Sequence, residues 1–162
     1  ESPLGAILAL ADDDGLYVFD WVDRRGLERE IVRLRARTKF AIVPGTHPVL
    51  DQATREIDEY FAGQRKVFTL PLAHRGTDFQ RRVWDALLNI PAGETRSYAE
   101  IAKGIGEPKA VRAVARANGD NYRGIIIPCH RVIGSDGSLT GYGGGLARKQ
   151  WLLDHERAMT SK

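Results

Sequence analysis

Chemistry in this chain centres on Cys129, the only cysteine among 162 residues. Pro128 precedes it, and His130 and Arg131 follow it. Positive charge close to a thiol lowers the thiol pKa and raises the reactive thiolate fraction. A cysteine that follows three isoleucines is more often an inert core residue, but the proline and the charged pair mark the end of the apolar run, where side chains leave the core. We therefore expect Cys129 to be a nucleophile.

His130 is the candidate base for this thiol. In an extended strand, adjacent side chains point to opposite faces. Cys129 and His130 would then be unable to pair directly, and a bridging water is the natural link between them. We also expect an acidic residue to orient the imidazole, with Glu156, Glu100 and Asp154 as the alternatives.

The same residue types give no support for disulfide or metal chemistry. A single cysteine cannot form an internal disulfide framework or an all-thiolate zinc site. The remaining histidines, His47, His74 and His155, are scattered along the chain, and we interpret them as surface or structural residues. We expect no metal and no cofactor.

Composition describes an ordinary globular protein with a mild basic excess. Hydrophobic residues make up 43% of the chain, and 24 basic against 21 acidic side chains give a net charge of +3. No apolar run approaches the roughly 20 residues of a membrane span, and the first residues lack the basic segment of a signal peptide. We expect a cytoplasmic protein with no membrane partner. The missing initial methionine fits a piece of a longer protein.

The basic excess is concentrated in the second half. Residues 1–75 carry 11 basic and 12 acidic side chains, and residues 76–162 carry 13 and 9. Between Arg96 and Arg131, seven basic residues face three acidic ones. Such a strip is either a solvated surface or a face that binds phosphates.

Residues 1–75 are predicted to form an α/β lobe. Two apolar runs separated by an Asp-Gly cluster indicate a β-hairpin, and two segments with apolar residues at helical spacing indicate helices. A third alternating run completes a predicted three-stranded antiparallel sheet. The expected segments are strands at 6–10, 16–22 and 66–70, helices near 27–34 and 49–61, and a linker at 71–77.

Residues 76–162 are predicted to be mostly helical. Thr77–Gln80 and Ser97–Glu100 are capping boxes, each of which begins a helix. Gly104 and Gly106 end the second helix. Pro108 is a favoured first residue for the next helix, which is expected over 109–117. Two short helices joined by a tight turn indicate a helix-turn-helix. A buried strand at 125–127 and a final amphipathic helix at 146–156 follow.

The helix at 109–117 has one face nearly bare of side chains. Ala110, Ala113 and Ala117 lie at positions i, i+3 and i+7. A face of this kind either packs closely against another helix or lets the backbone approach a nucleic-acid groove. The spacing does not decide between the two.

The segment Pro128–Ile133 resembles the Pro-Cys-His-Arg-Val active-site motif of the O6-alkylguanine-DNA alkyltransferases, also called methylated-DNA–protein-cysteine methyltransferases. Arg112-Ala113-Val114 resembles the arginine-finger segment of that family, and Asn121 its hinge asparagine. Segments 141–146 and 149–156 resemble its closing loop and final helix. The resemblance is strong over residues 77–157 and loose over 1–75.

This resemblance implies direct-reversal DNA repair, in which the alkyl group of O6-alkylguanine, and of O4-alkylthymine, passes irreversibly to the protein once per molecule. Cys129 would be the nucleophile and alkyl acceptor, with His130 as its base through a water. Glu156 would orient His130, Asn121 would brace the active-site turn, and Tyr98 would donate a hydrogen bond to guanine N3. The implied fold is a ribonuclease H-like lobe followed by a winged-helix-type DNA-binding domain.

The resemblance also implies a binding mode. Backbone groups at Cys129 and Val132 would read the guanine amino group, and Tyr142 and Gly143 would line the alkyl pocket. Arg112 would replace the flipped-out nucleotide in double-stranded DNA that is bound through the minor groove. The implied protein is a monomer, associated with the nucleoid if it is bacterial. The expected DNA-binding residues are Arg96, Lys109, Ala110, Ala113, Arg116 and Arg131.

One departure from the family pattern concerns the wall of the pocket. Many members have Asn-Pro-x-Pro where this chain has Asn121-Tyr122-Arg123-Gly124. We expect the loss of two prolines to loosen this segment and widen the pocket, so that the sequence does not fix the preferred alkyl size.

Two other functions remain open from the sequence. A helix-turn-helix damage sensor would carry a non-essential cysteine. A cysteine hydrolase would use Cys129 with His130, although adjacent residues make a poor direct pair and no oxyanion-hole motif is present.

Overall fold

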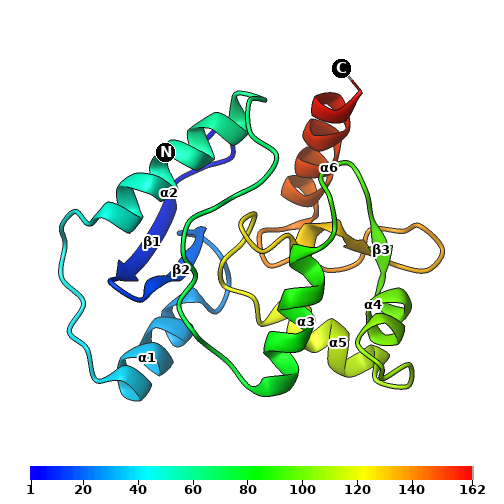
Figure 1. The fold of residues 1–162 in the computed structure, drawn as a ribbon, viewed down its shortest axis with the longest axis horizontal. Coiled ribbons are helices and arrows are strands. Elements are labelled where there is room, and N and C mark those ends of the chain that lie inside the picture. Colours follow the sequence, from blue (N-terminus) through cyan, green and yellow to red (C-terminus); the bar gives the residue numbers. More distant parts are fainter. Residues whose placement is uncertain (162) are drawn as a thin grey trace.

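The N-terminal half is a β-hairpin with two helices. The computed structural model describes residues 1–161, in which strands β1 (Ile7–Asp12) and β2 (Gly15–Trp21) pair antiparallel, with Ile7 opposite Trp21. Helix α1 (Leu27–Thr38) follows the hairpin, and α2 (Pro48–Phe61) packs on both strands (Figure 1). The predicted hairpin and both helices are confirmed.

The predicted third strand is wrong, because the sheet has two strands. Residues 66–70 form no ladder, and the backbone amide of Thr69 donates instead to Glu56 Oε1 at 2.7 Å. The free edge of β2 is covered by two non-strand segments. Leu16 bridges to Leu72, and Phe19 bridges to Arg123 of the C-terminal half. At Thr69 a side chain thus takes the backbone donor that a ladder would have used.

The C-terminal half is mainly helical, as predicted. Both capping boxes are present, so Thr77 and Ser97 each cap a helix. The described elements in chain order are α3 (Asp78–Leu88), β3 (Arg96–Ser97), α4 (Tyr98–Gly104), α5 (Val111–Gly119), the 3₁₀ turn η1 (Cys129–Arg131), β4 (Val132–Ile133) and α6 (Leu146–Thr160).

Helices α4 and α5 pack together as the predicted helix-turn-helix, with two differences. Helix α5 begins at Val111 rather than at Pro108, since residues 108–110 form a turn in which the Ala110 amide donates to Glu107 O. The only strands described after α3 are the two-residue β3 and β4, which pair in parallel. The part of the chain that the structure describes thus has no hairpin wing next to α5.

The three isoleucines before Pro128 join the two halves, but not as the strand that the sequence predicted. Residues 125–127 form a turn in which Ile125 has a φ of 67°. This conformation is unfavourable for a β-branched residue. Ile125 and Ile126 are buried with Phe19 of β2, whereas Ile127 is buried with Cys129 and the C-terminal helices. Burial on both sides holds the turn that presents the cysteine.

None of the helices in residues 1–161 combines the length and the apolar character that crossing a bilayer requires.

Loss of the α3 cap should destabilise the fold. We expect Thr77→Ala to lower the free energy of unfolding by about 1 kcal/mol, because it removes the acceptor for the Gln80 amide. Urea unfolding measures this change. Thr54→Ala, within exposed α2 surface, is the matched control and should cause no loss. Equal losses in both variants would contradict the capping role.

Candidate active site

Cys129 lies in a short 3₁₀ turn at the junction of the two halves. Its amide donates to Ile127 O at 2.8 Å, and the residue is only 5% exposed. The turn replaces the extended strand that the sequence predicted, so the argument that neighbouring side chains take opposite faces does not apply. Burial nevertheless shields the thiol from solvent.

Asn121, to which the resemblance gave a bracing role, makes two hydrogen bonds in this turn. Its Nδ2 donates to Ile127 O at 2.9 Å, and its Oδ1 accepts from the Arg123 amide at 3.0 Å. Both bonds are within the turn that leads to Cys129. Because the asparagine is itself buried, these bonds are shielded from competing water.

A second buried network orients His130. Glu156 of α6 accepts from His130 Nε2 at 2.7 Å and from Arg131 at 2.8 and 3.0 Å. The hydroxyl of Tyr60, which comes from α2, donates to the same carboxylate at 2.7 Å. Glu156 and His130 are both 0% exposed. Of the three acidic residues considered from the sequence, Glu156 is thus the one that holds the imidazole.

The network fixes which histidine nitrogen is available as a base. An ionised carboxylate can only accept, so Nε2 carries the proton toward Glu156 and Nδ1 keeps its lone pair. His130 Nδ1 is buried and has no hydrogen-bond partner among the described residues. Burial lowers the pKa of His130 and outweighs the attraction of Glu156, so the imidazole is neutral at pH 7. The site therefore holds a neutral base with one free acceptor.

The thiol needs this base. Burial raises the pKa of Cys129 and outweighs the side chain of Asn121 and the positive charges of Arg24 and Lys149, which lower it. At neutral pH the sulfur is consequently a thiol, and it becomes a nucleophile only when the proton is removed. We expected positive charge at His130 and Arg131 to lower the thiol pKa. The charges that do so belong to Arg24 and Lys149, and burial outweighs them, so the expected relay through His130 is needed.

The N-terminal half contributes a charged clamp that sequence reasoning missed. Arg24 pairs with Asp20 at 2.6 Å, and both side chains are buried. The guanidinium also donates to the carbonyl oxygens of Asn121 and Gly119, and it stacks on the Tyr122 ring at 3.8 Å. An acidic residue inside the apolar run of β2 was the available signal, because a buried carboxylate requires a partner.

This clamp holds residues 121–124, the segment that we expected to be loose because it lacks two prolines. Besides the bonds from Arg24, the Phe19 amide of β2 donates to Tyr122 O at 2.9 Å. The buried Arg123 donates to Leu16 O and to Ala73 O. Hydrogen bonds to the N-terminal half thus restrain this segment in the absence of the two prolines.

The glycine-rich segment at 141–145 lies against His130 and Arg24. Tyr142 lies near His130, with ring centroids 6.4 Å apart, and its buried hydroxyl has no described partner. A side chain at Gly143 would clash, because an added Cβ would lie 2.4 Å from Arg24 Nε. Lys149 of α6 is buried and donates to Val132 O and Thr140 O, which fixes the start of this segment.

Comparison with known proteins accounts for both halves of the chain. Residues 78–158 match the DNA-binding domain of 6-O-methylguanine DNA methyltransferase, and residues 1–74 match its ribonuclease-like domain. The chain belongs to this family. The resemblance noted in the active-site motif is therefore confirmed across the whole chain.

Similar proteins cover the chain almost completely. It is 44% identical to the methylated-DNA–protein-cysteine methyltransferase of Methanosarcina acetivorans, over 96% of this chain and 94% of that protein. It is 45% identical to the constitutive methyltransferase of Bacillus subtilis, over 97% and 92%. Among solved structures, Mycobacterium tuberculosis OGT in complex with DNA aligns with a TM-score of 0.84 and 45% identity, covering 98% of this chain and 91% of that one.

The structure also places the other residues that the resemblance singled out. Tyr98 begins α4, and its hydroxyl accepts from Thr140 Oγ1 at 2.8 Å. The Val132 carbonyl accepts from Lys149 Nζ at 2.6 Å. Of the expected DNA-binding residues, Arg96 and Ala110 are half-buried, whereas Lys109, Ala113 and Arg116, together with Arg112, are exposed.

Arg131 is the exception, and the prediction that it contacts DNA is wrong. It is 5% exposed, and its guanidinium is occupied by Glu156 and by Ile90 O. A buried charge paired in this way cannot also reach a phosphate. Its role is to balance the carboxylate that holds His130.

Residues 1–161 contain no group of three or more histidine, cysteine, aspartate or glutamate side chains arranged to hold a metal ion.

Removal of the Glu156 charge should destabilise the protein and flatten its acid response. Burial opposes ionisation of Glu156, but the bonds from His130 and Arg131 outweigh it and hold the pKa well below its ordinary value of 4.5. A lowered carboxyl pKa adds stability above the unfolded-state pKa, and this stability is lost as the pH falls below about 4.5. We expect Glu156→Gln to cost about 3–5 kcal/mol at pH 7, because Arg131 is left unpaired.

Urea unfolding at pH 7 and at pH 4 measures both effects. The wild-type free energy of unfolding should fall between these values by more than that of Glu156→Gln. Tyr60→Phe is the control, since it removes one hydrogen bond to the carboxylate but keeps the ion pair, and it should cost about 2 kcal/mol. An unchanged acid response in Glu156→Gln would contradict the assignment.

Proposed function

We propose that this protein repairs alkylated DNA by direct reversal, with transfer of the alkyl group from O6-alkylguanine to Cys129. One observation carries the proposal. The neutral imidazole of His130 is held by a buried carboxylate, and its free Nδ1 lies in the same turn as a buried, protonated thiol. Membership of the methyltransferase family and close similarity to a relative solved with DNA support the same function.

The chemistry needs only groups of the protein, one water and the DNA. The water between Cys129 and His130 takes the thiol proton and passes a proton to Nδ1. The sulfur attacks the alkyl carbon, a C–S bond forms, and the C–O6 bond breaks. The electron pair goes to guanine, which regains a proton donated by the protein, with Tyr98 as the donor toward N3.

The product explains why one molecule acts once. A thioether has no proton to lose and is a poor leaving group, so no group of the site can release the alkyl from Cys129. The reaction is therefore stoichiometric. We propose O4-alkylthymine as a second substrate on the same chemical ground, because its alkyl group is also bound through an enol-type oxygen.

Access to the buried sulfur supports base flipping. A guanine stacked in a duplex cannot bring O6 to a residue that is 5% exposed, so the nucleotide must leave the stack. Helix α5 exposes Ala113 beside Arg112 and Arg116. We propose that this small-residue face enters the minor groove, that Arg112 fills the gap in the stack, and that the protein binds as a monomer.

Transfer to Cys129 is tested by mass spectrometry after incubation with a duplex that carries one O6-methylguanine. We expect a gain of one methyl group on the Cys129 peptide, restored guanine in the DNA and no second turnover. Cys129→Ser should bind the lesion without a mass gain. Tight binding with an unmodified Cys129 in the wild type would support a damage sensor instead, and repeated turnover of a thioester would support a hydrolase.

Loss of the Arg112 side chain should affect duplex substrates only. Flipping costs a few kcal/mol, part of which Arg112 offsets, so we expect Arg112→Ala to slow transfer from duplex DNA about 10- to 100-fold. Transfer from the free base O6-benzylguanine should be unchanged. Single-turnover rates measure both, with Arg157→Ala on exposed α6 surface as the control. Equal slowing with both substrates would argue against the proposed role.

A further inference from the structure

Helix α1 carries a row of arginines that the active site does not use. Arg29, Arg33 and Arg37 are spaced by four residues, so they lie one above the other on one face and span about 12 Å. All three are exposed, and none is within ion-pair distance of an acidic side chain in residues 1–161. Like charges at this spacing repel each other. The row is therefore a positive surface with which no carboxylate pairs directly.

This row faces the helix proposed to enter DNA. Arg29 and Arg33 line a polar surface groove that Ala113 and Arg116 of α5 line as well. The start of α3 also lines this groove, with Phe79 and Gln80. Two residues expected to contact DNA thus border the same groove as two arginines of the N-terminal half.

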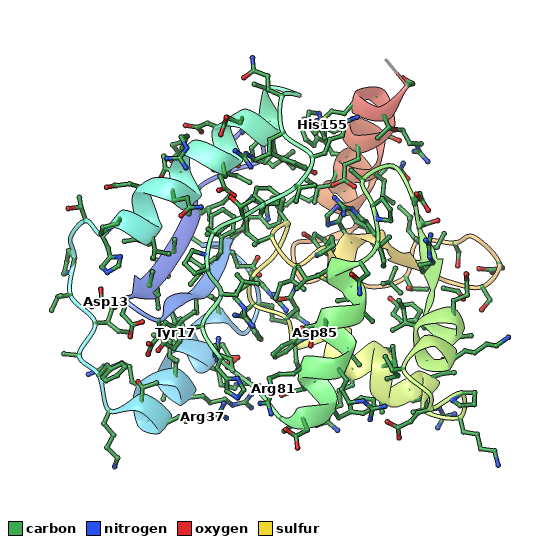
Figure 2. All side chains as sticks on the ribbon, in the orientation of Figure 1. Asp13, Tyr17, Arg37, Arg81, Asp85 and His155 are labelled. Carbon is green, nitrogen blue, oxygen red and sulfur yellow. The ribbon has the colours of Figure 1, made fainter. Side chains whose placement is uncertain are left out.

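The positive surface continues beyond the groove. Arg37 lines the next depression along the seam together with Arg75 and Arg81, and Figure 2 shows Arg37 on α1 close to Arg81 on α3. Two acidic residues partly balance this end, since Glu30 pairs with Arg75 and Asp78 pairs with Arg81.

One acidic residue lies within the groove itself. Asp120 accepts a hydrogen bond from Gln80 at 3.2 Å, and it is the only carboxylate among the described residues that line this groove. One carboxylate does not balance Arg29, Arg33 and Arg116. Net positive charge therefore remains next to α5.

We propose that Arg29, Arg33 and Arg37 bind the phosphate backbone of the same duplex whose minor groove receives α5, so that the N-terminal half extends the DNA site. This inference rests on the proposed function. Phosphates are the partner that an ordered, unpaired row of guanidinium groups fits, because arginine binds phosphate through paired donors. Continuity with Arg116 places the row on DNA that flanks the lesion.

The helix also offers its own control. Arg35 is exposed on α1 but lies on its other side, where it lines a depression with Leu8 and Leu10 of β1. Arg55 is exposed on α2. Arg35→Gln/Arg55→Gln therefore changes the net charge as much as Arg29→Gln/Arg33→Gln does, but away from the groove.

The test is the salt dependence of binding to a duplex with one central O6-methylguanine and two helical turns on each side. Each phosphate contact adds about 0.9 to the slope of log affinity against log salt concentration. We expect Arg29→Gln/Arg33→Gln to reduce the slope by about 1.8 and to weaken binding on the order of 10- to 100-fold at 0.1 M salt. The control double variant should keep the wild-type slope.

Measurements of alkyl transfer distinguish failure of this inference from failure of the proposed function. All variants should accept the alkyl group from free O6-benzylguanine at the wild-type rate. If wild type accepts no alkyl group from base or DNA, the proposed function fails. If transfer is intact but the slope of Arg29→Gln/Arg33→Gln is unchanged, only the phosphate-binding row is overturned. Loss of cooperativity between protein copies, with an unchanged slope on a single-site duplex, would also overturn it in favour of a second copy as partner.

Discussion

The buried carboxylate of Glu156 is the constraint on which the rest of the structure depends. A carboxylate without water is stable only when donors surround it, and this one receives them from Tyr60, His130 and Arg131. Tyr60 belongs to α2, and His130 and Arg131 belong to the active-site turn η1. The site is therefore complete only when the two halves and the final helix are packed together.

The N-terminal half is consequently part of the active site rather than a support for it. Tyr60 reaches the carboxylate, and the Asp20–Arg24 pair binds the backbone at Asn121. These bonds and the burial of the isoleucines hold Ile125 in its unfavourable backbone conformation. Contacts between halves thus stabilise the strained turn that places a protonated thiol beside a neutral base.

Local signals predicted much of this arrangement, and long-range competition explains what they missed. The capping boxes at Thr77 and Ser97 and the hairpin depend on neighbouring residues, so the sequence was sufficient for them. The third strand is missing where the Thr69 amide bonds to the side chain of Glu56, which is distant in the sequence. The isoleucine run is a turn, with Ile125 and Ile126 buried in one hydrophobic core and Ile127 in another. Spacing could not predict that a basic residue beside the cysteine, Arg131, would be buried against Glu156.

We propose that neutral His130, held by Glu156, removes the Cys129 proton through a water. The most direct measurement is the single-turnover rate of alkyl transfer from free O6-benzylguanine as a function of pH, in wild type and in His130→Gln. In wild type the rate should rise through a pKa below 6.5 and then stay level through neutral pH, because the base is already neutral. In His130→Gln it should be lower by about 10²–10⁴-fold at pH 7 and keep rising into alkaline pH as the thiol itself ionises. Identical profiles for the two proteins would contradict the account.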